Sequence, residues 1–214
     1  MASATLAAPF RLSTRGGTPS GALDLAAIVG HIDWARLPAC LRRRFDAGHG
    51  PARYDGTMAL ERSAIGGWFA WLVRPFGAPL PVRRLIDAPV TVTVRAGTGG
   101  VVWERRFGPH HRVRSVKSPG PANTVIERTD GGLAMVLDVS VEDGALVFTS
   151  RRFFLSIGSW RLPIPAVLTP GTCRVEHRAV DEHRFTFSMT MTHPLWGTTF
   201  RQSGLFNDPP ESTP

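Results

Sequence analysis

An arginine between two aromatic residues is the first feature of this chain that could do chemistry. Trp103, Arg105 and Phe107 alternate along one segment, and alternate residues of a strand lie on the same face. If that face is the interior of a sheet, the charge of Arg105 needs a buried carboxylate as its partner. We expect Glu176 to be this partner, with Asp138 as the alternative. The pair would be either a structural ion pair or the polar spot of an otherwise apolar binding cavity.

A tryptophan-rich helix, expected over residues 65–76, is the second candidate. Its aromatic and aliphatic side chains, Trp68 and Trp71 among them, would cover more than one face of the helix. This favours a helix that fills one end of the sheet as part of the core. It could instead be a gate over an apolar pocket, or a patch that contacts lipid while nearby arginines meet anionic head groups. Peripheral membrane contact is the less favoured alternative.

Sequence motifs for catalysis or metal binding do not accompany these residues. The chain contains neither G-x-S-x-G nor H-E-x-x-H. His110 and His111 would point to opposite faces of a strand and so would not chelate one ion, and the other histidines, such as His177 and His193, are expected in solvated turns. We therefore expect no catalytic residue, no metal and no cofactor, and a binding protein rather than an enzyme. A small enzyme that transfers protons in a cavity is an alternative.

The composition is that of one basic domain. Hydrophobic residues make up 43% of the 214 residues, enough for one full core. The net charge is +8, but the basic residues are scattered, all except Lys117 are arginine, and no nucleic-acid-binding motif accompanies them. We therefore expect no nucleic-acid partner. Residues 1–21 lack the basic start, apolar run and cleavage site typical of a secretory signal, and the two cysteines, Cys40 and Cys173, form no spaced framework. The expected compartment is therefore the cytoplasm.

Period-two alternation dominates the chain from residue 90 to residue 206, with Gly, Pro and Asp at the turns. The odd positions of residues 133–141 are all apolar, and residues 185–191 alternate in the same way, so each of these strands has one buried face. Repeated one-sided strands are typical of a barrel or a strongly bent antiparallel sheet. Three prolines in residues 161–170 exclude a central strand there, and this segment is expected to cross an end or edge of the sheet as a lid or a plug.

Short helices are expected before the sheet, over residues 22–29 and 38–46. The predicted fold is therefore α+β and mainly β: a curved or closed antiparallel barrel-like sheet, lipocalin-like in general form. Two or three short N-terminal helices precede it, and the tryptophan-rich helix covers it. The expected organisation is a disordered leader over residues 1–21, a single domain over residues 22–208 and a disordered tail over residues 209–214.

The order of these features resembles the bacterial DUF4166 family, a domain of unknown function. The resemblance covers residues 24–206 and is carried by the segments IVGHIDWARLPACLRRRFD, YDGTMALERS, WERRFG, RLPIPAVLTPG and FTFSMTMTHPLWGTTFRQSGLF. The matching positions are Trp103, Arg105, Phe107, Leu162, Pro163, Glu176, Pro194, Gly197 and Gly204. Gln202 departs from the family, which carries an aromatic residue near that point. Members are often fused behind a domain resembling saccharopine dehydrogenase, so the resemblance implies an oxidoreductase as a partner, although no G-x-G-x-x-G motif is present in this chain.

The function expected from this architecture is the binding of a small apolar molecule, such as a lipid or an isoprenoid. The candidate ligand-binding residues are Trp103, Arg105, Phe107, Asp138, Glu176, Trp68 and Trp71. An interaction domain for an oxidoreductase, with no ligand of its own, is the first alternative, and the small cavity enzyme is the second.

Overall fold

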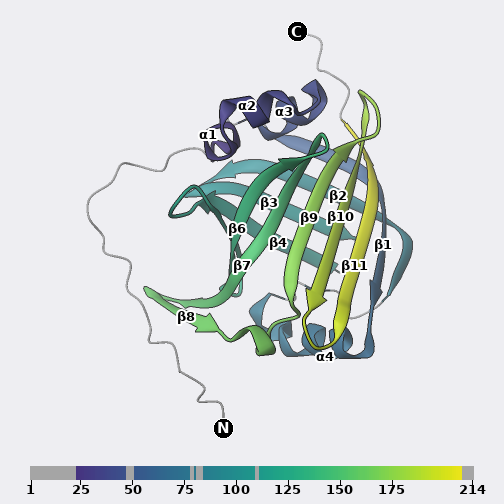
Figure 1. Ribbon diagram of the computed structural model, residues 1–214. Coiled ribbons are helices and arrows are strands. Elements are labelled where there is room, and N and C mark those ends of the chain that lie inside the picture. The colour runs from purple at the N-terminus through teal and green to yellow at the C-terminus, as the bar shows by residue number, and fades with distance from the viewer. Residues whose placement is uncertain (1–22, 47–50, 78–79, 81–83, 109–110, 209–214) are drawn as a thin grey trace.

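A closed antiparallel barrel forms the body of the protein (Figure 1). The computed structural model describes residues 23–46, 51–77, 80, 84–108 and 111–208. The predicted leader and tail lie outside these residues. The strands are β1 (Ala52–Arg62), β2 (Leu85–Gly97), β3 (Gly100–Phe107), β4 (His111–Pro119), β5 (Val125–Thr129), β6 (Leu133–Glu142), β7 (Ala145–Ile157), β8 (Trp160–Ile164), β9 (Thr172–Ala179), β10 (Arg184–His193) and β11 (Gly197–Asn207).

The barrel closes because β7 pairs on one side with β6 and on the other side with β9. Strands β1 to β7 pair in sequence order, β7 then pairs with β9, and β9, β10 and β11 lead back to β1. Among the described strands, ten therefore make up the closed ring, and β8 pairs with the end of β7 outside it. The predicted fold class, mainly β with a closed antiparallel sheet and few short helices, is confirmed.

The proline-rich segment partly returns to the sheet. Residues Trp160–Ile164 form β8, and Pro163 lies in it opposite Phe154 of β7. Proline is tolerated here because β8 is an edge strand. The chain then forms the short 3-10 helix η2 (Ala166–Leu168) before it enters the barrel at β9.

Three short helices cover one end of the barrel: α1 (Leu25–Val29), α2 (His31–Ala35) and α3 (Ala39–Phe45). The Asp24 carboxylate accepts a hydrogen bond from the Ala27 amide at 2.9 Å and so begins α1. Leu41 and Phe45 of α3 are buried in the main hydrophobic core. This core is built from inward-facing residues of nearly every strand, as the alternation predicts.

The opposite end of the barrel carries α4 (Ala64–Leu72) and the 3-10 helix η1 (Arg74–Phe76). Gly66 lets α4 approach β11 closely, because a Cβ atom at this position would overlap the Thr199 carbonyl. Phe69 and Ala70 pack inward against Phe200. The expectation that α4 plugs one end therefore holds for one face of the helix, while the other face is exposed. No helix in the described part of the chain is long and apolar enough to cross a membrane.

Candidate ligand-binding site

A buried cluster of charged residues lies inside the barrel on three neighbouring strands. Lys117 of β4 and Glu127 of β5 are cross-strand partners, and the Lys117 Nζ lies 2.8 Å from the Glu127 Oε2. The Ser115 hydroxyl donates a hydrogen bond of 2.7 Å to the Glu127 Oε1. Arg105 of β3 is the third charge, with its guanidinium 3.8 Å from the same oxygen. The side chains of Lys117 and Glu127 are 7% and 8% exposed, so water does little to screen these charges.

The neighbouring cations keep Glu127 ionised. Burial alone would raise the pKa of this carboxyl group, but Lys117 and Arg105, with the hydrogen bonds from Lys117 and Ser115, lower it to about 2. Burial lowers the pKa of Lys117, and this effect is opposed by Glu127 and increased by Arg105. The cluster thus sets two basic side chains, Arg105 and Lys117, against a single carboxylate in the barrel interior.

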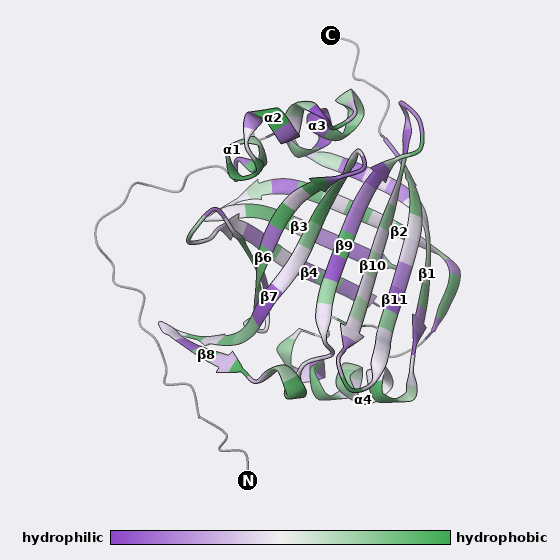
Figure 2. Cartoon of the chain, in the orientation of Figure 1, coloured by the Kyte–Doolittle hydropathy of each residue, from purple (hydrophilic) through white to green (hydrophobic). Residues whose placement is uncertain are grey.

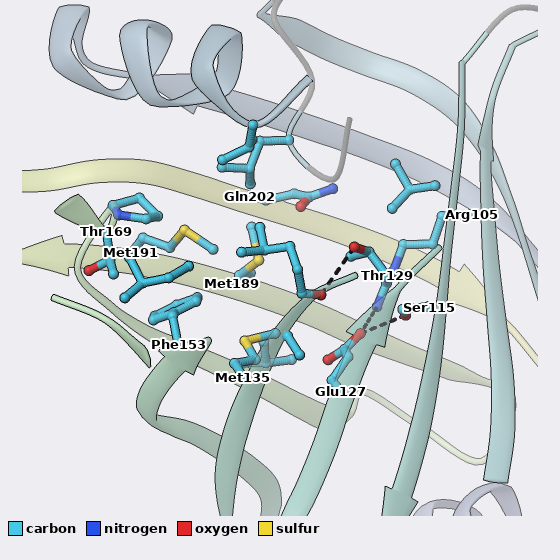
Figure 3. A pocket seen from close by; sticks show the side chains of 18 of the residues that line it. Arg105, Ser115, Glu127, Thr129, Met135, Phe153, Thr169, Met189, Met191 and Gln202 are labelled. Carbon is cyan, nitrogen blue, oxygen red and sulfur yellow. Dashed lines mark hydrogen bonds and ion pairs between the residues drawn. The ribbon is translucent and has the colours of Figure 1, made fainter. Parts of the chain in front are cut away.

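Beside this cluster is a cavity of about 120 Å³ (Figure 3). Most of its lining is apolar, including the side chains of Phe107, Val113, Met135, Phe153, Val175, Phe187, Met189 and Met191. Its polar lining comes from Arg105, Ser115, Glu127, Thr129, Thr169 and Gln202. At its other end it is lined by Leu80, by Val73 after α4, and by Leu168 of η2. Leu168 both lines the cavity and is 56% exposed to solvent. The η2 turn therefore forms the wall between the cavity and the surface at this point.

Arg105 is the cation that faces this cavity. Its guanidinium lies 5.9 Å from the centre of the Phe187 ring, and its 3.8 Å separation from Glu127 is too long for a hydrogen bond. Within the described residues, no acceptor forms a hydrogen bond with it. Lys117, by contrast, is paired with Glu127 and lies near the rings of Trp103 and Phe148. Arg105 therefore presents to the cavity a guanidinium that forms no hydrogen bond within the described residues.

Aromatic residues fill the other half of the interior around His177. The rings of Phe45, Phe148 and Phe187 lie 4.9, 6.1 and 5.4 Å from the His177 ring. Burial, with the charges of Arg44, Lys117 and Arg105, holds the pKa of His177 well below its usual value, so this imidazole is neutral. The prediction of solvated turn histidines is wrong for His177 and for His193, which are 4% and 1% exposed.

The structure brings only part of the predicted site together. Arg105 and Phe107 line the cavity. Trp103 faces inward as expected but is packed against Phe45, with ring centroids 5.9 Å apart, and does not line the cavity. Trp68 and Trp71 lie on the outer face of α4 and are 50% and 61% exposed.

The predicted partner of Arg105 was wrong. Glu176 points out of the barrel, where it binds Arg178 at 2.8 Å, because the odd positions of β9 face the interior. Asp138 is also on the outer surface and binds Arg151 at 2.6 Å. Glu127 takes the place that was assigned to them.

Sequence reasoning missed Ser115, Lys117 and Glu127, although two signals pointed to them. Lys117 is the single lysine among the 25 basic residues, so an arginine-rich composition does not account for it. Glu127 follows Val125 at a spacing of two, which places both on one face of β5, and Val125 is fully buried. Alternation on β4 and β5 would therefore have placed a lysine and a glutamate on the interior face, although neither residue was predicted to lie there.

Comparison with known proteins agrees with the resemblance seen in the sequence. No curated protein matches the chain. The family model of DUF4166, described as a domain of unknown function, matches residues 37–206, which include β1 to β10 and all of β11 except its last residue. Because this match covers well over half of its length, the chain belongs to the DUF4166 family.

Proposed function

We propose that the barrel binds a small apolar molecule that carries one anionic group, of the lipid or isoprenoid class. The observation that carries this proposal is the Arg105 guanidinium, which faces an otherwise apolar cavity and lies 3.8 Å from Glu127, too far for a hydrogen bond. A buried charge without a full partner is costly. A carboxylate on the ligand would neutralise it and would accept the charge-assisted hydrogen bonds that Glu127 is too far away to accept.

The size of the cavity limits what fits without rearrangement. Its volume of about 120 Å³ is slightly below the ~150 Å³ of an engineered cavity in another protein that accommodates benzene. A short acyl chain or a single isoprene-sized group is therefore the natural first ligand. Met135, Met189 and Met191 line the cavity, and their unbranched side chains can shift to admit a longer chain.

The proposal places this binding in the cytoplasm. Cys40 and Cys173 are both buried and unpaired, as is usual for proteins of a reducing compartment. Burial raises the pKa of the Cys173 thiol to about 12, so this side chain acts as an apolar residue of the core rather than as a nucleophile.

Calorimetric titration with octanoate and octan-1-ol tests the proposal, because the two molecules share a chain and differ in the anion. We expect octanoate to bind more tightly. The Arg105→Leu variant should weaken octanoate binding about 10- to 100-fold, the equivalent of roughly 1.5–3 kcal/mol for a hydrogen bond to a charged group, and should leave octan-1-ol binding nearly unchanged.

Arg106→Leu is the matched control. Arg106 is the next residue of β3, points outward and pairs with Glu104, and its side chain is 61% exposed. This variant should bind octanoate like the wild type. The proposal fails if neither octanoate nor octan-1-ol binds at millimolar concentration, or if both leucine variants weaken octanoate binding equally.

A further inference from the structure

Exposed apolar side chains gather at the α4 end of the barrel, from three segments that are distant in the sequence. We call them the apolar rim: Trp68, Trp71 and Leu72 of α4, Val167 and Leu168 of η2, and Leu195 and Trp196 of the β10–β11 turn. Each is between 38% and 72% exposed. A single exposed leucine needs no explanation, but a group of this kind at one end of a molecule marks an interaction surface.

Contacts join the segments of the apolar rim. Trp196 lies against α4, with its ring 5.8 Å from the Phe69 ring, and stacks on His193 at 4.0 Å. Val73, at the end of α4, and Leu168 of η2 line the same cavity. Figure 1 shows α4 and the segment after β8 at the same end of the barrel, and Figure 2 shows hydrophobic colouring along α4.

The charge at this end is positive. The segments 64–76, 160–168 and 194–196 contain no Asp or Glu and two arginines, Arg74 and Arg161. Arg161 of β8 lies near Arg128 of β5 and Arg152 of β7. Burial lowers the pKa of Arg161, and the charges of these two arginines lower it further. At the end covered by α1 to α3, the exposed Asp33 and Asp181 are paired with Arg36 and Arg184.

We infer that the α4 end docks on the surface of an anionic lipid bilayer. Tryptophan favours the boundary between lipid chains and head groups, where its ring is buried and its N–H stays hydrated. Arginines beside such a patch are attracted to anionic head groups. The carboxylate beside η1, Asp130, is paired with Arg114 at 2.6 Å, so it leaves Arg74 and Arg161 to meet anionic head groups. An apolar surface bordered by such cations has the chemistry of a peripheral membrane contact. The inference does not depend on the proposed ligand. Leu168 does belong both to the cavity lining and to the apolar rim, so a ligand that leaves past η2 would enter the bilayer.

Co-sedimentation with vesicles tests this docking. The full chain is mixed with vesicles of phosphatidylcholine containing one quarter phosphatidylglycerol, or of phosphatidylcholine alone, at low and high salt. We expect binding to the anionic vesicles, weaker at high salt because exposed charges are screened. The double variant Trp68→Ser/Trp71→Ser should weaken binding at least about tenfold, because half-exposed indole surface no longer enters the lipid. The pair Arg74→Gln/Arg161→Gln should weaken it roughly tenfold.

A control at the other end of the molecule removes the same number of exposed apolar residues. Ile32 of α2 and Val180 of the β9–β10 turn are 84% and 51% exposed, and Ile32→Ser/Val180→Ser should bind vesicles like the wild type. Arg105→Leu should also leave vesicle binding intact, which separates this test from that of the ligand. The inference is overturned if the wild type stays in the supernatant at low salt, if neutral and anionic vesicles bind equally, or if the two serine pairs have the same effect.

Discussion

Replacing Glu127 with glutamine should destabilise the barrel far more than the same change on its surface. Glu127 is the single anion of the buried cluster and faces Lys117 at 2.8 Å and Arg105 at 3.8 Å. Glutamine keeps the size and the acceptor oxygen for Ser115 but removes the negative charge. Two cations would then face each other with no counter-ion, in a place where 17% of the Arg105 side chain and 7% of the Lys117 side chain are exposed.

The size of this destabilisation follows from the role of the Glu127 charge as the counter-ion of two basic side chains inside the barrel. Removing one partner of a buried ion pair costs about 3–5 kcal/mol because the other charge is left uncompensated. For a chain of this length, that loss corresponds to a melting temperature lower by about 6–20 °C. The pKa of Glu127 gives a similar figure, since its fall from 4.5 to about 2 corresponds to roughly 3 kcal/mol.

This pKa also fixes the sign of the pH dependence. A carboxyl group with a lowered pKa in the fold stabilises the protein above its unfolded pKa, and the contribution is lost as the pH falls through the folded value. The contribution of Glu127 is therefore complete above about pH 4.5 and is lost toward pH 2. The wild type should lose more stability across this window than Glu127→Gln.

Urea unfolding at pH 7 and at steps down to pH 3 measures both effects, with Glu176→Gln as the matched control. Glu176 pairs with Arg178 on the outside of β9, and its side chain is 25% exposed, so its change should cost at most about 1 kcal/mol. The reasoning is refuted if the two glutamine variants are equally stable at pH 7, or if Glu127→Gln retains the full acid dependence of the wild type.

Two further predictions concern the two ends of the barrel. His177→Phe should reduce the loss of stability between pH 7 and 5. Burial lowers the pKa of His177, so in this range the unfolded chain takes up a proton that the folded protein does not. Melting temperatures measured across this range test the prediction, and it is contradicted if the melting temperature of the variant falls with pH as steeply as that of the wild type. Gly66→Ala should destabilise the protein by at least about 2 kcal/mol in urea, since the added methyl group overlaps the Thr199 carbonyl. Gly67→Ala on the same helix is its control, because the methyl group there meets only the end of the Arg62 side chain and the helix gains up to about 1 kcal/mol of propensity.

The barrel could be predicted because the pattern that indicates each strand lies within that strand's own sequence. Strand β10 places apolar residues on one face and polar residues on the other, and that alternation needs no knowledge of the partner strand. In β6 the expectation of one buried face holds from Leu137 onward, but Ala134 and Val136 on the opposite face are also buried, in a small cluster with Ile126 and Phe154. The closure through β7 could not be predicted, because it depends on one long strand that pairs with β6, β8 and β9 at different points along its length. Such pairings are set by the whole sheet rather than by any segment.

The partner of Arg105 was missed for a related reason. The face of Arg105 could be predicted from Trp103 and Phe107, but its neighbour across the sheet depends on register. In the structure Arg105 lies opposite Val113 of β4, and the carboxylate reaches it from β5, one strand further away. Applying alternation to Glu176 and Asp138 would have excluded both, since Asp138 lies between the inward-facing Leu137 and Val139, and Glu176 lies between the inward-facing Val175 and His177.

The two halves of the barrel interior have different roles. At the α1–α3 end, Phe45 and the aromatic residues around His177 fill the space, so substitutions there should change stability first. At the α4 end the interior is hollow, the Arg105 guanidinium faces it 3.8 Å from Glu127, and the short turn at η2 separates it from an exposed apolar rim. A ligand would therefore enter and leave past η2 and α4. Arg105 lines the cavity from β3, where it would hold the anionic end of the ligand while the chain of the ligand lies along the apolar lining.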